Sequence, residues 1–415
     1  MKLLFVANNC EHPNEMHINN IRGFMNISTV DFFGPGYSTE KELKAGVQAY
    51  WEERGGYDAL FLDFSFAMLQ SEYLDIREAY HWHRYYMSDY NIFNAIRYAD
   101  KIVAETFKID AVKIVWYYFD TVKVSERWEQ CIQALLEQGF YFRGYGNEFV
   151  PEMEEGERIH SVGFSNRYRE FSCKNEKKII SMPYQTASLQ EWYNRPLEER
   201  PYDFAVPGSV DRKNNLSRMT IMEQLMNSRY SLYDQFYDRD LSYRMGPKRV
   251  ECSLYKSDED KYLDSKLKIA SPYLNARLSR DSIAMWRENF SVSIRASKIG
   301  YTAGGLSRQI IRKYVEIPAR GALLMSEDIP PLKNFGFIEG ENIIVVTPEN
   351  VIEICDELFQ NPERMQDIAD KGREMVFGKH TPEIHAKHTI ASICAIQKGA
   401  FQGSRWENGE FIIQK

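Results

Sequence analysis

The sequence predicts an α/β protein built from two doubly wound halves, each a parallel sheet covered by helices. Short apolar runs alternate with amphipathic stretches along most of the chain, which is typical of parallel strands joined by helices. The alternation starts again at Asp203, after the charged, proline-bearing segment 194–201. Such segments separate domains, so we expect domains at 1–200 and 201–381, with a helix and tail over 382–415.

In the first half, four apolar runs are predicted to be strands and two amphipathic stretches to be helices. The strands are expected over 3–7, 59–64, 113–119 and 179–182, and the helices near 75–106 and 125–138. In the second of these helices Trp128, Ile132 and Leu135 recur at three- and four-residue spacing, which favours one buried face.

The second half repeats this pattern, interrupted by a long polar stretch near 240–270. Helices are expected near 213–227, 307–317, 349–360, 362–377 and 382–398, and strands at 203–206, 231–237, 322–326 and 343–346. Doubly wound sheets bind ligands beyond the carboxyl ends of their strands. Two facing halves would therefore place a site in the cleft between them.

Composition narrows the class of protein. The chain is 44% hydrophobic and 27% charged, and its formal net charge of −7 disfavours whole-chain attraction to nucleic acid or anionic lipid. The opening apolar run is too short for a secretory signal, and no stretch has the length of a membrane span. Six dispersed cysteines form no C-x-x-C pair, so we expect a cytoplasmic protein in a reducing environment.

A glycine-bearing loop that opens a helix is the strongest local signal. Gly304 and Gly305 would allow the backbone to approach a ligand, and Ser307 would cap the helix. Phosphate suits such a helix start, where Arg308 or Arg312 could add charged hydrogen bonds. An ordinary loop-to-helix junction explains the same residues equally well.

Glu316 is a candidate for binding a sugar diol. Its two carboxylate oxygens could accept hydrogen bonds from the 2′ and 3′ hydroxyls of a ribose. Arg312 precedes it by four residues, and an ion pair within the helix is the alternative that spacing alone favours.

The segment 312–324, Arg-Lys-Tyr-Val-Glu-Ile-Pro-Ala-Arg-Gly-Ala-Leu-Leu, resembles the donor-site signature of GT-B glycosyltransferases. The similarity is to the group 1 branch, which includes spore-maturation-type enzymes. It continues through Glu327, the strand at 343–346, the helical stretch 361–374 and the junction at His380.

This resemblance implies two Rossmann-like domains facing a cleft, with the last helix crossing back to the first domain. It also implies transfer of a sugar from a nucleotide-sugar co-substrate to a hydroxyl of a glycan, glycolipid or small molecule, without metal or another cofactor. Glu316 would bind the donor ribose, and the Gly304–Gly305 loop would lie by the phosphates. The first loop of the donor domain would contribute Gly208, Ser209, Arg212 and Lys213, although surface charges explain the last two equally well.

Two features of the reaction stay open in the sequence. Many retaining relatives carry a glutamate eight residues before the ribose-binding one, where this chain has Arg308, so sugar contacts and stereochemistry are undecided. An inverting enzyme also needs a general base. Asp120 and His17 rank highest, ahead of His12 and Asp63, although each is more often a loop stabiliser.

Other functions compete with this interpretation. Asp238 and Asp240 form an Asp-x-Asp triplet, which in metal-dependent transferases holds a cation against a diphosphate, and Asp258 and Asp260 form another. A binding or scaffold protein without turnover and a nucleotide-sugar epimerase are further alternatives. We expect no metal site at His81-Trp-His83, because on a helix the two rings diverge. Peripheral membrane contact is compatible with the sequence.

Overall fold

The computed structural model divides the chain into two compact units. The described residues are 1–8, 15–74, 89–117, 125–150, 152, 159–183, 185–208, 216–233, 290–305 and 308–415. One unit comprises Met1–Thr186 with Pro382–Lys415, and the other comprises Ala187–Thr381. Each is an α/β arrangement around its own parallel sheet, as the sequence predicts.

The units divide at residue 187, whereas the sequence places the boundary at 200. The segment between these positions packs with the second unit, where Leu197 N donates to Gln366 Oε1 at 2.8 Å. The buried Arg200 guanidinium donates to the carbonyl oxygens of Ser297 and Arg320 at 3.0 Å. The charged, proline-bearing segment therefore belongs to the second unit and does not mark the boundary. The carbonyl oxygens that accept from the buried Arg200 lie in that unit.

The first unit contains a six-stranded sheet in the order β2-β1-β3-β4-β5-β6. Its strands are β1 (Lys2–Val6), β2 (Thr29–Phe33), β3 (Ala59–Asp63), β4 (Val112–Trp116), β5 (Phe140–Gly144) and β6 (Ile179–Ser181). All neighbouring pairs are parallel, and the order of strands reverses between β1 and β3. Neither β2 nor β5 was predicted from the sequence, because Asp31 and Gly144 are weak strand formers and Arg143 is charged.

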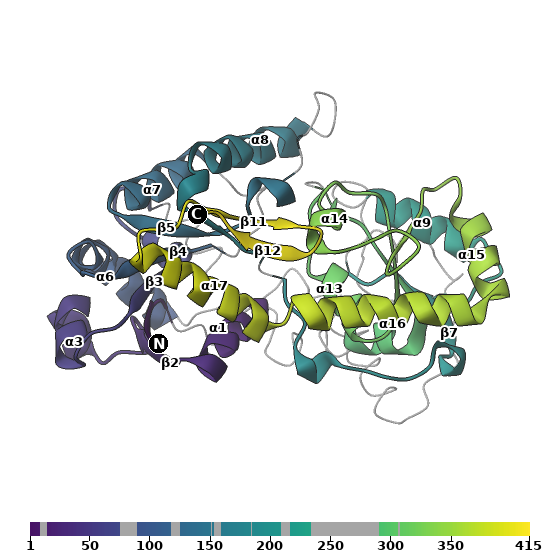
Figure 1. Ribbon diagram of the computed structural model, residues 1–415, viewed down its shortest axis with the longest axis horizontal. Helices are drawn as coiled ribbons and strands as arrows, with labels where there is room; N and C mark the ends of the chain where they lie inside the picture. The colour runs from purple at the N-terminus through teal and green to yellow at the C-terminus, as the bar shows by residue number, and fades with distance from the viewer. Residues whose placement is uncertain are drawn as a thin grey trace. The chain divides into compact units, whose positions relative to one another are not determined.

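Helices cover both faces of this sheet (Figure 1). They are α1 (Glu15–Ile27), α2 (Glu40–Ala45), α3 (Val47–Glu53), α4 (Phe64–Ala67), α6 (Asp89–Thr106), α7 (Glu126–Glu137), α8 (Ile159–Lys174) and α17 (Pro382–Gln397), with short 3-10 turns at η2 (Asn147–Phe149) and η3 (Glu176–Lys178). Phe24 of α1 and Ile393 of α17 share one core with Phe5 and Phe61 of the sheet. Trp128 of α7 packs edge-to-face on Phe142 on the opposite face.

The last helix, α17, belongs to the first unit, where it lies along α1. A Cβ added to Gly23 would stand 2.2 Å from the carbonyl oxygen of Pro382, so the two backbones meet there. Beneath them the fully buried Arg143 donates from Nε to Thr389 Oγ1 at 3.0 Å and from Nη2 to Asn20 Oδ1 at 3.3 Å. Burial lowers the pKa of this guanidinium to about 9.

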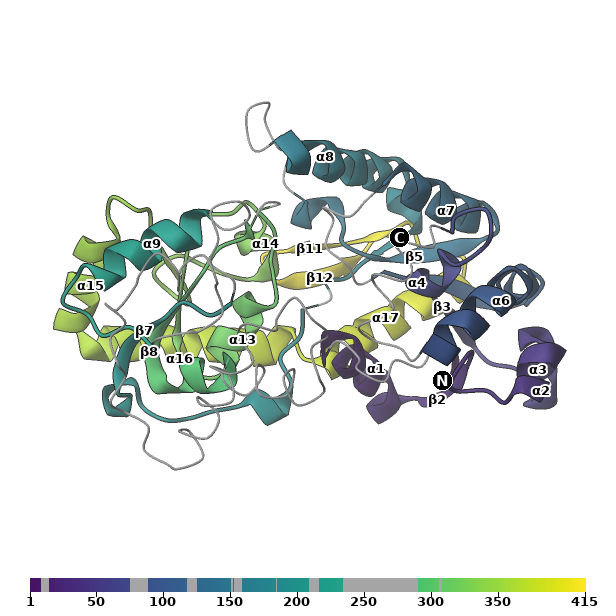
Figure 2. The ribbon, with the colours of Figure 1, turned by 180° about the vertical axis from the view of Figure 1, so that it is seen from behind.

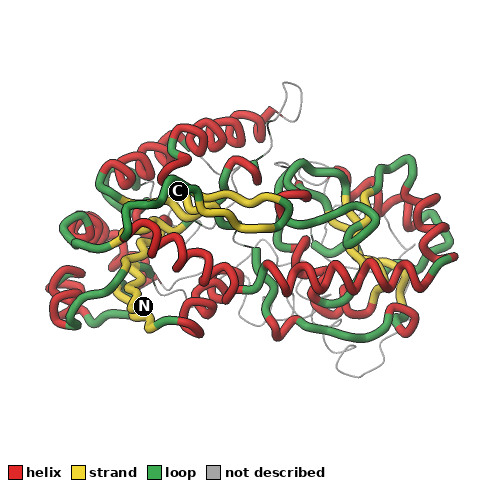
Figure 3. The backbone as a smooth tube through the Cα atoms, in the orientation of Figure 1, coloured by secondary structure: helices red, strands yellow, loops and turns green. Residues whose placement is uncertain are grey.

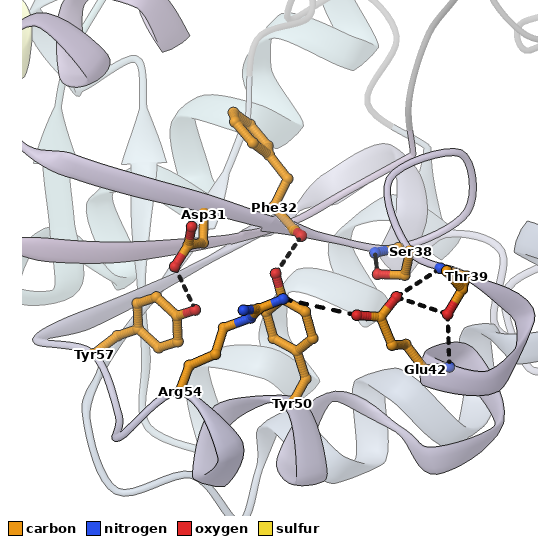
Figure 4. Close-up of polar contacts among 9 residues, drawn as sticks. Asp31, Phe32, Ser38, Thr39, Glu42, Tyr50, Arg54 and Tyr57 are labelled. Carbon is orange, nitrogen blue, oxygen red and sulfur yellow. Dashed lines mark hydrogen bonds and ion pairs between the residues drawn. The ribbon is translucent and has the colours of Figure 1, made fainter.

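Two tyrosine side chains, Tyr50 from α3 and Tyr57 from the segment after it, contact the edge strand β2 (Figure 4). Tyr50 Oη donates to the carbonyl oxygen of Phe32 at 3.2 Å, and Tyr57 Oη donates to Asp31 Oδ2 at 2.7 Å. Arg54 lies over the Tyr50 ring and pairs with Glu42 at 3.7 Å. An edge strand exposes unpaired backbone groups, and the hydrogen bond from Tyr50 satisfies one of them in β2.

The C-terminal tail, for which the sequence predicts no element, forms the hairpin β11 (Ser404–Glu407) and β12 (Glu410–Ile413), which ends beside the C-terminus in Figure 3. Trp406 is buried and donates from Nε1 to the carbonyl oxygen of Ser181 at 2.9 Å. Its backbone N–H donates to Glu148 Oε1 at 2.8 Å. The hairpin is therefore part of the first unit's fold.

The second unit contains a four-stranded parallel sheet in the order β10-β9-β8-β7. Its strands are β7 (Tyr202–Ala205), β8 (Ser297–Thr302), β9 (Leu323–Ser326) and β10 (Ile344–Val345). Its helices are α9 (Leu216–Met226), α13 (Lys313–Ala319), α14 (Leu332–Phe335), α15 (Val351–Gln360) and α16 (Pro362–Lys379), with 3-10 turns at η4 (Leu189–Glu191) and η5 (Leu197–Glu199). Figure 2 shows α13 next to α16, and α13 also contacts the strands β8 and β9.

Several elements of this unit differ from the prediction. The helix expected near 307–317 begins only at Lys313, and β8 occupies 297–302, where no strand was predicted. In place of the strand expected at 231–237, the described part shows a bridge between Leu232 and Phe204, and 234–237 lie outside the described residues.

Candidate functional site

The carboxyl ends of β7, β8 and β9 lie at one edge of the second sheet, since neighbouring strands are parallel. The segments that follow them begin at Val206, Ala303 and Glu327. Ligands of doubly wound proteins bind at such edges. The predicted Gly208, Gly304 and Gly305 all fall in these segments, so tertiary structure brings the two glycine loops to the same edge.

Gly208 lies against a lysine from α13. Its φ is 95°, and a Cβ added there would stand 2.4 Å from Lys313 Cε and 2.8 Å from Lys313 Nζ. Arg218 Nη1, from α9, would be 3.8 Å away. A glycine is needed here both for the backbone conformation and for the space that the lysine occupies. Two cationic side chains thus converge on the loop after β7.

Arg218 is only 2% exposed, which is unusual for an arginine. Its Nη2 donates to the carbonyl oxygen of Ala303, after β8, at 3.4 Å. The guanidinium therefore links the loops that follow β7 and β8. The sequence contains a signal for it, because Arg218 lies at helical spacing from the buried Met222 and Leu225. An arginine on the apolar face of a helix is rarely a surface charge.

The Gly304–Gly305 loop is folded onto its own backbone. Gly304 N donates to Glu327 Oε1 at 2.9 Å, and Gln309 N donates to the Gly304 carbonyl oxygen at 3.2 Å. A Cβ at Gly304 would stand 2.9 Å from the backbone of Arg308, whereas Gly305 borders open space. Arg308 has a φ of 47°, a conformation seldom adopted by residues other than glycine.

This geometry corrects one prediction about the loop. The helix that was to point its N-terminus at a phosphate is separated from the glycines by residues 308–312. Arg312, not Ser307, precedes the helix, and its side chain makes no capping hydrogen bond. The local Gly-Gly signal reflects a tight turn, because closing the chain at Gly304 leaves no room for a side chain.

Glu316 lies on α13, and only 1% of its side chain is exposed. Arg312 Nε donates to Glu316 Oε1 at 2.5 Å, so the ion pair considered from spacing is present. Since Lys313 lies on the same short helix, α13 supplies both a carboxylate and a cation to this part of the unit.

Most of the other predicted site residues lie outside the part of the chain that the structure describes. Ser209, Arg212, Lys213, Asp120, His12 and the triplet of Asp238 and Asp240 lie outside the described residues. His17 lies on α1, and its side chain is not described. Asp63 caps α4, accepting from Ser65 N at 2.7 Å, which is a structural role.

The described residues contain no group of three or more His, Cys, Asp or Glu side chains able to hold a metal ion. In the described part of the chain, no helix combines the length and apolar character that a membrane crossing requires.

The chain is similar to known proteins in part of its sequence and in its fold. Residues 274–391 match the family model described as glycosyl transferase-like. No protein of curated function matches the sequence. The sucrose-phosphate synthase from Thermosynechococcus elongatus is structurally similar at a TM-score of 0.50 and 11% identity, over 96% of this chain and 100% of that one.

A glycosyltransferase from Rickettsia africae is similar to the same degree, with a TM-score of 0.50 and 11% identity over 96% of this chain and 98% of that one. At such low identity the likeness to these structures establishes the fold alone, and the family model covers residues 274–391. The expected fold is confirmed: this chain has the two-domain architecture of GT-B glycosyltransferases, and its residues 274–391 are glycosyl transferase-like.

Proposed function

We propose that this protein is a glycosyltransferase that moves a sugar from a nucleotide-sugar donor to an acceptor hydroxyl. One observation carries the proposal. Lys313 and Arg218 converge on Gly208 at the carboxyl end of the second unit's sheet, and Lys313 lies within the glycosyl transferase-like segment. Two cations at the ligand-binding edge of a doubly wound sheet suit the phosphates of a nucleotide.

In the proposed reaction, the bond between the sugar and the leaving phosphate oxygen breaks, and negative charge develops on the nucleotide. Lys313 Nζ and Arg218 Nη1 stabilise that charge, and each well-placed donor is worth about 3 kcal/mol at the transition state. Ser209, Arg212 and Lys213 remain proposed phosphate contacts on the same loop, as do Gly304, Gly305 and Arg308 at the end of β8. These groups would supply the required charge without a metal or a further cofactor.

Glu316 is the proposed ligand of the donor ribose. Arg312 engages its Oε1, and the ribose hydroxyls would donate to the remaining acceptor positions of the carboxylate. A buried carboxylate held by an arginine keeps its direction, so it can select a vicinal diol over a deoxy sugar.

The acceptor side belongs to the first unit. Asp120 and His17 stay the proposed general bases if the reaction inverts the anomeric centre. A hydroxyl of a glycan, a lipid-linked sugar or a small molecule is the proposed acceptor, and the cytoplasm the proposed location, with peripheral membrane contact compatible with both.

A thermal-unfolding screen against UDP, GDP, ADP, CMP and their sugar conjugates tests the donor site. A ligand at about 100 times its Kd should raise the free energy of unfolding by about 2.7 kcal/mol. Lys313→Ala and Glu316→Ala should each lose the shift. Lys398→Ala removes an exposed lysine of the first unit and serves as the matched control. No shift with any nucleotide would sink the proposal.

Transfer assays separate this function from its alternatives. Nucleotide binding without donor hydrolysis or sugar transfer to any acceptor would favour a scaffold protein. Activity that disappears with a chelator and returns with a divalent cation would favour a metal-dependent transferase using Asp238 and Asp240.

A further inference from the structure

Two ion pairs involve the residues that flank α13, which are Arg312 before its first residue and Arg320 after its last. On one side Arg312 holds Glu316, as described above. On the other, Arg320 Nη2 pairs with Glu191 Oε1 at 2.9 Å, with the two side chains 7% and 14% exposed. The acidic partner comes from η4, far away in the chain, and Ser188 N donates to its other carboxylate oxygen at 2.8 Å.

Arg320 connects the two pairs. Its Nη1 donates to the backbone carbonyl oxygen of Glu316 at 3.1 Å, and its Nε donates to Ser291 Oγ at 3.1 Å. The same carbonyl also accepts a hydrogen bond from the backbone N–H of Arg320 at 3.3 Å, and a cation is favourable at the C-terminal end of a helix. The guanidinium thus binds the main chain of the very residue whose carboxylate is the proposed ribose ligand.

The charges within this group influence one another. Burial raises the pKa of Glu191 most strongly, Arg320 opposes that shift, and the nearby charge of Glu316 raises the pKa further. The carboxylates of Glu191 and Glu316 are therefore close enough to interact. Removing the Glu191 carboxylate breaks its ion pair with Arg320 and leaves Arg320 as a buried cation. Such a change usually forces the surrounding structure to rearrange.

We propose that Glu191 is a positioning residue for the nucleotide ribose: through Arg320 it holds the end of α13 and thereby sets the direction of the Glu316 carboxylate. This inference rests on the proposed function, and it adds to the donor site a residue that lies outside the glycosyl transferase-like segment. Glu191 does not touch the nucleotide. It affects which ribose hydroxyls can donate hydrogen bonds to Glu316.

The test compares UDP, GDP and ADP with their 2′-deoxy forms by isothermal titration calorimetry. In the wild type, a missing hydroxyl leaves a buried carboxylate with one hydrogen bond fewer, which lowers affinity about tenfold or more. Glu191→Gln should weaken binding of the ribonucleotide and bring that ratio down to about threefold or less, because a misdirected Glu316 no longer distinguishes the two.

Matched variants separate positioning from stability. Glu198→Gln makes the same chemical change at an exposed carboxylate seven residues later and should leave the ratio as in the wild type. Glu191→Asp keeps the charge but shortens the reach, and Arg320→Lys keeps the charge but loses the forked contact, so both should lower the ratio. Thermal unfolding without ligand shows which of the variants remain folded.

The outcomes are distinguishable. If the wild type binds none of the nucleotides, the proposed function itself fails. If the wild type discriminates and Glu316→Ala abolishes discrimination, yet folded Glu191→Gln or Glu191→Asp keeps the wild-type ratio, the donor site stands and the role of Glu191 is overturned. Equal weakening of both nucleotides in the Glu191 variants overturns it as well.

Discussion

The side chain of Lys313 occupies the space where a side chain at residue 208 would lie. Gly208 follows β7 and Lys313 begins α13, and a Cβ on the glycine would stand 2.4 Å from the lysine Cε. This relationship joins the loop after the first strand to the helix that carries Glu316. The loop and the helix are both needed for the proposed donor site, so the first substitution to test is one at Gly208.

Gly208→Ala should weaken nucleotide binding by about tenfold or more, because the new methyl group displaces the lysine. The positive φ adds about 1–3 kcal/mol of backbone strain. Gly340→Ala is the control, since Gly340 has a φ of 74° and open space around its Cβ position. It should show similar strain in thermal unfolding and unchanged nucleotide affinity in calorimetry. Equal affinity losses in both variants would contradict the displacement of Lys313.

Arg218→Met should weaken a nucleoside diphosphate but not the corresponding nucleoside. Methionine fills most of the buried volume without the charge, so the core around Met222 and Leu225 should remain packed. Loss of one charged hydrogen bond to phosphate is expected to cost about 1.5–3 kcal/mol of binding free energy. Calorimetry with uridine and UDP, or the pair that the screen identifies, gives the comparison. A parallel loss for both ligands would show that Arg218 only supports the fold.

Glu148 should make stability depend on pH. Its carboxylate accepts from Ser181 Oγ at 2.5 Å and Trp406 N at 2.8 Å. Burial nevertheless raises its pKa above the ordinary 4.5. The folded state therefore holds this proton more tightly than the unfolded state, and the resulting stability is present below pH 4.5 and is lost as the pH rises through the raised value.

Glu148→Gln removes that titration. The difference in unfolding free energy between wild type and variant should therefore shift in favour of the variant as the pH rises from about 4.5 to 7. Thermal unfolding of both proteins across this range measures it. A difference that stays constant with pH would mean that the carboxylate has an ordinary pKa in the folded protein.

Gly23→Ala should destabilise the first unit by about 1–3 kcal/mol, because the added methyl group meets the backbone carbonyl of Pro382. Gly378→Ala is the matched control within a helix, since its Cβ position has no neighbour within 4 Å. That change should stabilise by up to about 1 kcal/mol through helix propensity. Chemical unfolding followed by circular dichroism compares them, and an unaffected Gly23→Ala would show that α1 and α17 can separate at no cost.

The sequence predicts elements best where local patterns and tertiary packing agree. The spacing of Trp128, Ile132 and Leu135 places a helix at 125–138, and α7 spans Glu126–Glu137. The prediction fails where polar residues lie in buried strands, as with Arg143 in β5, because its acceptors Thr389 and Asn20 come from elements far away in the sequence. Local composition contains no information about such partners.

Some residues of the candidate site were identified from the sequence, and others only from the structure. Gly208, Gly304 and Glu316 were singled out from the sequence, although their roles stay predictions. Arg218 and Glu191 were not. Arg218 could have been noticed from its place on the apolar face of a helix, whereas Glu191 carries no distinctive signal before its partner is known.

By itself the sequence determined the α/β class, the two halves and the resemblance of the donor segment, because periodicity and motif are local properties of the chain. The tertiary structure showed that α13 begins at Lys313, so its N-terminus is separated from the Gly304–Gly305 loop. Only the tertiary structure decided that Lys313 and Arg218 converge on Gly208 and that Glu191 pairs with Arg320. These are contacts between segments that the parallel sheet brings together at its carboxyl edge or that burial of a charge forces into proximity. No spacing along the chain encodes them.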